Sequence, residues 1–275
     1  MRYHKYKVSV YLKIRQIELN FMKIPGINAL RLAKKKYVLG NVYMQDKFHL
    51  HARKKFDEEI QKTPSRTEII NFVLSKTAKD PVYLEIGVRN PADNFDKINC
   101  KEKYSVDPGY ENKNNAVDFP MTSDEFFAAV RKGEILDKNI RFDLIFIDGS
   151  HLAEQVSKDI DNALQYLKED GTIIMHDCNP PTAFHASEYY DYTLSPAKTL
   201  WNGTTWKAFF KARQRNDISS CCIDTDWGVG IISKKNNLGP PSQIDNGFYE
   251  YKIFDENRKE SLNLMSFEKF KEIFK

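Results

Sequence analysis

The sequence predicts an α/β fold in which a mainly parallel β-sheet is covered by helices on both faces. From residue 82 onward, short apolar runs alternate with segments of helical periodicity, which is the order of elements that such a sheet requires. Several of the apolar runs end in an acidic residue. Two further apolar runs within residues 218–232 indicate an antiparallel hairpin that closes the sheet.

The elements in the first half follow from capping signals and apolar runs. A helix is expected from Ser65, a favourable cap, with an apolar side supplied by residues between Ile69 and Leu74. Strands are expected at residues 82–88, 104–107 and 116–119. The segment TSDEFFAAVRKGE should then form a helix, because Thr122 and Glu125 make a capping box.

The second half repeats the alternation. Residues 144–147 form the most strand-like run, a helix is expected at residues 152–167 with Gly171 beyond its end, and the strand TIIMHDC follows. Residues 179–200 have no period and predict a long loop of the kind that often serves as a lid. Three elements complete the predicted fold. They are a helix capped by Asn202 or Thr204, the hairpin with a tight turn at residues 225–226, and a final helix at residues 266–274.

One main domain with two extensions is expected from the length of 275 residues. The predicted parts are a basic N-terminal extension at residues 1–62, the main domain at 63–239, and a tail with a short helix at 240–275. The four cysteines have neither CxxC nor metal-ligand spacing, so we expect reduced thiols and a cytoplasmic protein. We expect no membrane span and no signal peptide.

Positive charge is concentrated near the N-terminus. Residues 1–55 contain fourteen Lys and Arg residues against Glu18 and Asp46, a net charge of +12, so the remainder carries −8 of the total of +4. A helix packed on the main domain with a solvated basic face is the favoured interpretation. Contact with an anionic membrane through residues 1–55, or with a phosphorylated substrate, is the alternative, and no nucleic-acid motif accompanies the charge.

Acidic residues at the strand ends predict where a ligand binds. In an open parallel sheet, ligands bind beyond the carboxyl ends of the strands, and Glu85, Asp107, Asp148 and Asp177 lie at such ends. Glu85 and Asp107 are 22 residues apart, close to the spacing at which an acid binds ribose hydroxyls. This spacing favours an adenosine cofactor. A dinucleotide is disfavoured because the loop has Gly87 without a GxGxxG motif.

The motifs LEIGVR, VDP, FIDGSH, IMHDCNPPT and DTDWGVGII occur in this order between residues 67 and 233. Together they resemble class I S-adenosylmethionine-dependent methyltransferases, most of all the bacterial sugar and natural-product O-methyltransferases, including those that act on macrolide sugars. The resemblance implies a Rossmann-like sheet of seven strands with an antiparallel last strand, and S-adenosylmethionine as the cofactor.

The resemblance also implies a set of cofactor-binding residues. Asp107 would bind the ribose, and Thr122 or Ser123 would lie near the adenine. The family's Gly-x-Gly is here Gly87-Val88-Arg89, so a side chain of the loop must hold the methionine end, and an exposed Arg89 is the alternative to a bidentate contact. The candidates for that end are Arg89, Asn90, Asp93 and Asn94. The complete predicted set is Glu85, Gly87, Arg89, Asn94, Asp107, Thr122, Ser123 and Asp148.

His151, with Asp148 and Asp177, forms the predicted catalytic group. O-methyl transfer needs a hydroxyl that loses its proton as it attacks, and the resemblance to macrolide-sugar enzymes implies that His151 is the general base. Its structural alternative is a cap of the following helix. Asp148, Asp177 and Asn179 are the predicted ligands of Mg²⁺, but Cys178 stands where relatives commonly have a second acid or amide, which weighs against a metal.

The leading functional prediction is methyl transfer from S-adenosylmethionine to a hydroxyl of a sugar or glycan precursor, in the cytoplasm or at the inner face of the membrane. One alternative is an NAD-linked sugar oxidoreductase, which the missing GxGxxG disfavours. Another is a non-catalytic, membrane-associated partner in polysaccharide synthesis. The sequence leaves the acceptor and the oligomeric state open, and no nucleic-acid partner is expected.

Overall fold

The computed structural model describes residues 26–77, 79–189, 194–197 and 200–275, which form two compact units, Met1–His51 and Ala52–Lys275. The described part of the first unit contains α2 (Ile27–Gln45) and the beginning of α3 (Lys47–Glu59). The first 25 residues of the basic extension predicted at residues 1–62 lie outside the described residues. Among the described helices, none is long and apolar enough to cross a membrane.

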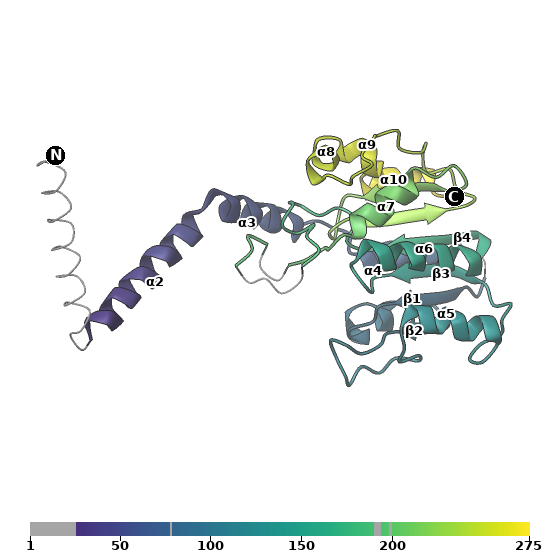
Figure 1. Cartoon of the computed structure of the whole chain (residues 1–275). Helices are drawn as coiled ribbons and strands as arrows, with labels where there is room; N and C mark the ends of the chain where they lie inside the picture. Colours follow the sequence, from purple (N-terminus) through teal and green to yellow (C-terminus); the bar gives the residue numbers. More distant parts are fainter. Residues whose placement is uncertain (1–25, 78, 190–193, 198–199) are drawn as a thin grey trace, which may run out of the picture. The chain divides into compact units, whose positions relative to one another are not determined.

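The second unit is built on a seven-stranded sheet with the order β2-β1-β3-β4-β6-β5-β7. Figure 1 labels the first four strands of this order, β2, β1, β3 and β4. The neighbours β2, β1, β3 and β4 run parallel, and β6 lies antiparallel between β4 and β5. The predicted seven-stranded α/β sheet, with its antiparallel strand from the C-terminal hairpin, is confirmed. The strands are β1 (Val82–Ile86), β2 (Glu102–Val106), β3 (Phe142–Ile147), β4 (Leu167–Met175), β5 (Ser219–Ile223), β6 (Val229–Ser233) and β7 (Leu264–Met265).

The strand predicted at residues 116–119 is wrong. Phe119 makes only an isolated bridge to Val106, because the carboxylate of Asp118 accepts from the backbone N–H of Ser105 at 2.9 Å and replaces a ladder bond there. Pro120 follows and has no N–H to continue the pairing. The seventh strand is instead the short β7, which pairs in parallel with β5.

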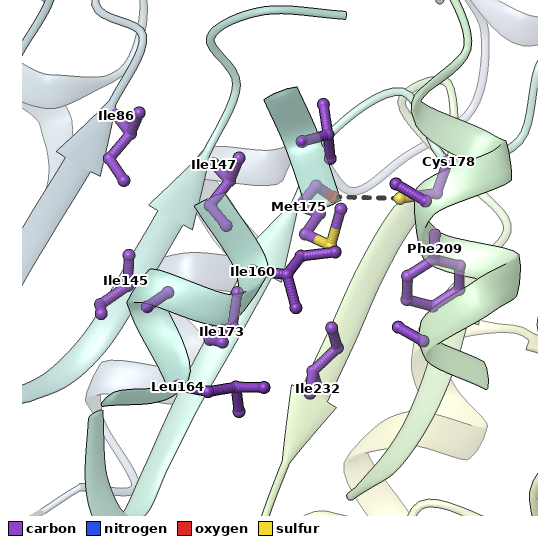
Figure 2. Packing of buried hydrophobic residues seen from close by; sticks show 14 of the residues in the cluster. Ile86, Ile145, Ile147, Ile160, Leu164, Ile173, Met175, Cys178, Phe209 and Ile232 are labelled. Atoms are coloured by element: carbon purple, nitrogen blue, oxygen red, sulfur yellow. Dashed lines mark hydrogen bonds between the residues drawn. The ribbon is translucent and has the colours of Figure 1, made fainter. Parts of the chain in front are cut away.

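Helices cover both faces of this sheet. The faces follow from the alternation along β3, where Leu144 and Phe146 join one apolar cluster and Ile145 and Ile147 join the other. The first cluster includes residues of α4 (Arg66–Leu74) and α10 (Phe267–Ile273). The second includes residues of α5 (Ser123–Lys132), α6 (Ala153–Tyr166), α7 (Thr205–Arg213), α8 (Tyr251–Glu256) and α9 (Arg258–Leu262), and Figure 2 shows part of this packing.

Helix capping agrees with the sequence at two helices and differs at a third. The Glu68 carboxylate accepts from the Ser65 N–H at 2.9 Å, and Thr122 accepts from the Glu125 N–H at 3.3 Å, so α4 and α5 begin as predicted. Thr204, one of the two predicted caps, is the N-cap residue of α7, but its side chain makes no capping hydrogen bond there. Asn202 donates to the Asp177 carboxylate, and Thr204 Oγ1 accepts from the Ala153 N–H at the start of α6. Asn202 therefore connects the start of α7 to the end of β4, and Thr204 connects it to the start of α6.

The hairpin loop is longer than the predicted tight turn. It spans residues 224–228, and Asp226, Trp227 and Gly228 have positive φ angles of 44°, 62° and 90°. A substituent on Gly228 would lie 2.3 Å from the Asn179 Cβ, so a glycine is needed at this position. The loop folds back towards the ends of the parallel strands, where the Asp226 carboxylate contacts Arg66 and His176.

Candidate active site

A cavity of about 990 Å³ lies at the carboxyl ends of β1, β2, β3 and β4, the edge at which the sequence predicts a ligand. This volume is at the upper end of the range for small-molecule sites. All but one of the predicted site residues line it. Those that line it are Glu85, Gly87, Arg89, Asn94, Asp107, Thr122, Ser123, Asp148, His151 and Asp177.

Gly87 allows the ends of β1 and β3 to approach each other. Its φ is 89°, and a Cβ at this position would lie 2.3 Å from the backbone oxygen of Asp148. Any L-residue would therefore be strained and would also push the two strand ends apart. The glycine is required for the packing of the sheet, whether or not a ligand is bound.

Glu85 is buried at the end of β1 with a raised pKa. Its Oε2 accepts hydrogen bonds from the Tyr83 hydroxyl at 2.6 Å and from Asn94 Nδ2 at 2.9 Å. Burial raises the pKa of Glu85 to about 7, with a smaller contribution from the negative charge of Asp148. The carboxyl group is therefore close to half protonated at neutral pH.

Asp107 is fixed by backbone donors after β2. Its Oδ2 accepts from the Val88 N–H at 3.0 Å, and its Oδ1 accepts from the Gly109 N–H at 2.6 Å. Each carboxylate oxygen has a further lone pair for a ligand hydroxyl. The arrangement fits the predicted ribose contact, because the acid is oriented before the ligand arrives.

The loop after β1 places the four candidates for the methionine end in different surroundings. Asn94 is buried and already bonded through both ends of its amide, to Glu85 and to Thr67. Arg89 is 69% exposed and pairs with Asp93 at 3.4 Å. Asn90 caps the short helix η1 (Pro91–Asp93) by accepting from the Ala92 N–H. All four line the cavity, and the choice among them stays a prediction.

Thr122 and Ser123 line the cavity at the N-terminus of α5. The Thr122 side chain is engaged in the capping box with Glu125. Ser123 Oγ donates to Asp159 Oδ1 at 2.6 Å, and burial raises the pKa of this carboxyl. Asp159 also lines the cavity, so an acidic group that was not predicted lies beside the two predicted hydroxyls.

The contacts of His151 define its tautomer. Its Nδ1 lies 3.1 Å from the backbone carbonyl oxygen of Trp201, which can only accept a hydrogen bond. Nδ1 therefore carries the hydrogen, and Nε2 of the neutral ring keeps a lone pair. Nε2 lies 3.7 Å from Asp148 Oδ1, and Nδ1 lies 3.3 Å from Asp177 Oδ2. These carboxylates stabilise the ring when it gains a proton.

Residues 201–204 hold His151 in place. The Trp201 indole stacks on the imidazole, with ring centroids 5.2 Å apart and an angle of 17° between the planes. The backbone N–H of Thr204 donates to the His151 carbonyl at 2.7 Å. Gly203, with φ 62°, leaves no room for a Cβ, which would lie 2.3 Å from the same carbonyl oxygen. The alternative role for His151 as a helix cap finds no support, because Leu152 is the residue that precedes α6.

His176 is buried among three carboxylates. Its Nδ1 lies 3.2 Å from Asp148 Oδ1 and 3.3 Å from Asp177 Oδ2, and its Nε2 lies 3.1 Å from Asp226 Oδ1. Since carboxylate oxygens accept hydrogen bonds, both ring nitrogens donate and the ring is an imidazolium. Burial alone lowers the pKa of His176, but the charges of Asp177 and Asp148 outweigh it and hold the pKa well above its ordinary value.

Arg66 adds a second cation beneath the cavity. Its Nη1 lies 3.4 Å from Asp226 Oδ1, its Nε lies 3.7 Å from Asp148 Oδ2, and its backbone N–H donates to Asp226 Oδ2 at 2.6 Å. Burial raises the pKa of Asp226, but His176 and Arg66 outweigh burial and lower it. In formal charges, the three carboxylates exceed the two cations, Arg66 and His176, by one. The site therefore favours a cationic ligand.

A cluster of three side chains has the donor set for a divalent cation. Asp148, His151 and Asp177 each offer one ligand atom, and these atoms lie within 4.8 Å of one another. Asn179, the third predicted ligand, is not brought to this cluster. Its Nδ2 donates to Asp224 Oδ1 at 3.1 Å and its Oδ1 accepts from Arg258, and it is not among the described residues that line the cavity.

Comparison with known proteins gives the family. A family model described as a methyltransferase domain matches residues 28–178, more than half of the chain. The chain belongs to the methyltransferase family. The predicted enzyme class, an S-adenosylmethionine-dependent methyltransferase, is thereby confirmed. No curated protein has a sequence that matches this methyltransferase.

Several solved structures are similar to the methyltransferase at low identity. A putative O-methyltransferase from Klebsiella pneumoniae shares 12% identity, with 73% of this chain and 96% of that chain covered and a TM-score of 0.39. An O-methyltransferase from Bacillus cereus, in complex with SAH, shares 14%, with coverages of 73% and 95% and a TM-score of 0.38. DesVI from Streptomyces venezuelae shares 10%, with coverages of 73% and 98% and a TM-score of 0.35. At these values the similarities assign no substrate.

Four residues that contact the carboxylates or the cations of the site are absent from the predicted set of catalytic, cofactor-binding and metal-binding residues of this methyltransferase. Arg66 begins α4, and Asp226 was expected only as part of a turn. Asn202 was expected to cap a helix, yet its Nδ2 donates to Asp177 Oδ1 at 2.7 Å. The adjacency of His176 to Asp177 at the end of a buried strand was the one available signal. The four residues are Arg66, His176, Asn202 and Asp226.

Proposed function

We propose that this methyltransferase transfers the methyl group of S-adenosylmethionine to a hydroxyl of a sugar or glycan precursor, with His151 as the general base. The observation that carries the proposal is the fixed tautomer of His151, whose Nδ1 donates to the Trp201 carbonyl. Oxygen acceptors need such a base, because a hydroxyl becomes a good nucleophile only as it loses its proton.

In the proposed reaction, His151 takes the acceptor's proton at Nε2. The ring then carries a positive charge, which Asp148 at 3.7 Å and Asp177 at 3.3 Å stabilise. Asn202 holds the Asp177 carboxylate at 2.7 Å, and the stacked Trp201 ring limits rotation of the imidazole. The base is thus oriented before the acceptor binds, as effective proton transfer requires.

The residues of the cavity fit S-adenosylmethionine, which supplies an electrophilic methyl group on a positively charged sulfur when bound. Asp107 is oriented to accept from the two ribose hydroxyls. Thr122, Ser123 and Asp159 line the same cavity and are candidates for contact with the adenine. The excess negative charge near Asp148 favours the cationic end of the cofactor over its neutral product, which promotes exchange after transfer.

The aromatic lining supports a sugar as the acceptor class. Trp201 and Trp227 both line the cavity, and the Trp201 ring stacks on the imidazole of His151. Indole rings bind the aliphatic C–H face of a sugar ring while leaving its hydroxyls accessible to polar groups. His151 and the carboxylates of Asp148 and Asp177 would then contact the reacting hydroxyl and its neighbours.

Mg²⁺ is a proposed auxiliary of this site. Asp148 and Asp177 would hold it through carboxylate oxygens, and its charge would lower the pKa of a bound hydroxyl. His176 donates to the same oxygens, which leaves fewer lone pairs for a metal. We expect EDTA to slow turnover and Mg²⁺ to restore it, with no response in Asp177→Asn. A rate that EDTA leaves unchanged would exclude the metal but would leave the role of His151 intact.

The test of the catalytic proposal separates binding from chemistry. S-adenosylhomocysteine binding is measured by calorimetry, and turnover is measured as S-adenosylhomocysteine release with a panel of free and nucleotide-linked sugars. His151→Gln should lower kcat by about 10²–10⁴-fold while the cofactor Kd stays within about twofold. His51→Gln, an exposed histidine outside the cavity, is the matched control. Failure of the wild type to bind S-adenosylhomocysteine would refute the proposal.

A further inference from the structure

Helix α2 combines a purely basic charge pattern with exposed apolar side chains. Among its nineteen residues, Arg31, Lys34, Lys35 and Lys36 are charged, there is no acid, and none is buried. After Lys36, residues 37–44 contain no charge. Large apolar side chains in this stretch are exposed, namely Tyr37, Val38, Leu39, Val42 and Met44.

The exposed apolar side chains of α2 indicate that another surface binds and covers them. Tyr37 is 71% exposed and Val42 is 62% exposed, and contiguous apolar surface of this kind on a protein marks an interaction site. The apolar residues surround the helix and do not form a single stripe. A partner that presents one groove would cover only some of them, whereas a fluid medium can surround several sides.

We propose that α2 is a peripheral anchor that binds an anionic lipid surface. The cluster of Arg31 and Lys34 to Lys36 would lie among the headgroups, where each cation near an anionic bilayer contributes to binding. Residues 37–44 would enter the boundary with the acyl chains, and the long lysine side chains reach back to the headgroups. Tyr37 suits this interface, where amphipathic aromatic rings accumulate.

Charge distinguishes an anionic lipid surface from two other possible partners of α2, a second copy of the helix and nucleic acid. A second copy of α2 would bring a cationic cluster against an identical one, which opposes self-association. Nucleic acid would attract the four cations, but would leave the charge-free residues 37–44 exposed to water. An anionic lipid surface complements both parts of the helix. Spanning the bilayer is not part of the proposal, because no described helix is long and apolar enough for that.

Vesicle flotation of the full chain tests the anchor. We expect the protein to float with vesicles in which about a third of the lipid is phosphatidylglycerol, and to remain at the bottom with phosphatidylcholine alone. Raising the salt from about 0.1 M to about 0.5 M should release most of it, since screening weakens the headgroup contacts. Equal binding to both kinds of vesicle, or to neither, would overturn the proposal.

Two variants and one control separate the charge from the apolar part. Reversing Lys34, Lys35 and Lys36 to Glu should lower the partition coefficient at least a hundredfold, and Val38→Ser with Val42→Ser should lower it about tenfold. The same reversal at the exposed Lys101, Lys132 and Lys138 of the second unit should have little effect. Thermal unfolding of each variant shows that the second unit stays folded.

Three further outcomes count against the anchor. If the control triple variant loses binding as strongly as the α2 variant, the effect is net charge and the helix has no special role. If sedimentation velocity shows a dimer that Val38→Ser and Val42→Ser dissociate, a second copy covers the helix. If duplex DNA binds through Lys34 to Lys36 while vesicles do not, the partner is nucleic acid.

Discussion

At the scale of single residues, Glu85 shows how burial of a carboxyl group that lines the cavity can oppose stability. Its pKa is 4.5 in the unfolded chain and about 7 in the folded protein, because burial disfavours the carboxylate. The folded state therefore binds this proton more tightly. The resulting stabilisation is complete below pH 4.5 and is lost as the pH rises through 7, a change of about 3 kcal/mol in unfolding free energy.

We expect Glu85→Gln to remove this pH dependence. The glutamine oxygen can accept from both Tyr83 and Asn94, since both hydrogen bonds reach one oxygen, Oε2, in the wild type. In urea unfolding without cofactor, the variant should match the wild type near pH 4.5 and exceed its stability by up to about 3 kcal/mol at pH 8.5. A difference that does not change with pH would mean that Glu85 is not the titrating group.

At the scale of elements, the segment of residues 201–204 connects α7 to His151, the proposed base. Gly203→Ala should strain a φ of 62° and press a Cβ against the His151 carbonyl. We expect a loss of unfolding free energy of about 3 kcal/mol and a fall in kcat of at least tenfold. S-adenosylhomocysteine binding should change little, because Asp107 and α5 are not displaced.

Gly133→Ala is the matched control for this variant. Gly133 also has a positive φ, 73°, but a Cβ there would meet nothing within 4 Å. It should therefore show only the conformational strain, about 1–2 kcal/mol, with kcat unchanged. If both variants lost equal stability and equal activity, contact between Gly203 and His151 would not be what positions the base.

The elements also show which parts of the fold are readable from local patterns. Helices with a capping box, such as the one that begins after Thr122, and buried strands that end in an acid were predicted because their signals are local. The strand at residues 116–119 failed because the Asp118 side chain competes for the N–H of Ser105, and periodicity does not report such competition. The extended hairpin loop was missed because non-glycine residues, Asp226 and Trp227, adopt positive φ.

At the scale of the whole molecule, the sequence predicted some contacts of the site and missed others. Asp148 and His151 follow one strand and Asp177 ends the next, so parallel pairing predicts that they meet. Arg66 and Asp226 are 160 positions apart, and their contact depends on the return of the C-terminal hairpin to the sheet. Single-sequence patterns carry no record of such pairings, and therefore the cations that balance the carboxylates could not be predicted.

The last prediction follows from the division of the chain into two compact units. All residues of both apolar clusters lie in Ala52–Lys275, and no described residue of Met1–His51 is buried. Deleting Met1–His51 should therefore leave the midpoint of urea unfolding within about 10% of its value in the full chain. The Kd for S-adenosylhomocysteine should stay within about twofold. Vesicle binding should disappear, while turnover of a soluble acceptor persists. A truncated protein that unfolds earlier or loses cofactor affinity would show that the first unit supports the catalytic one.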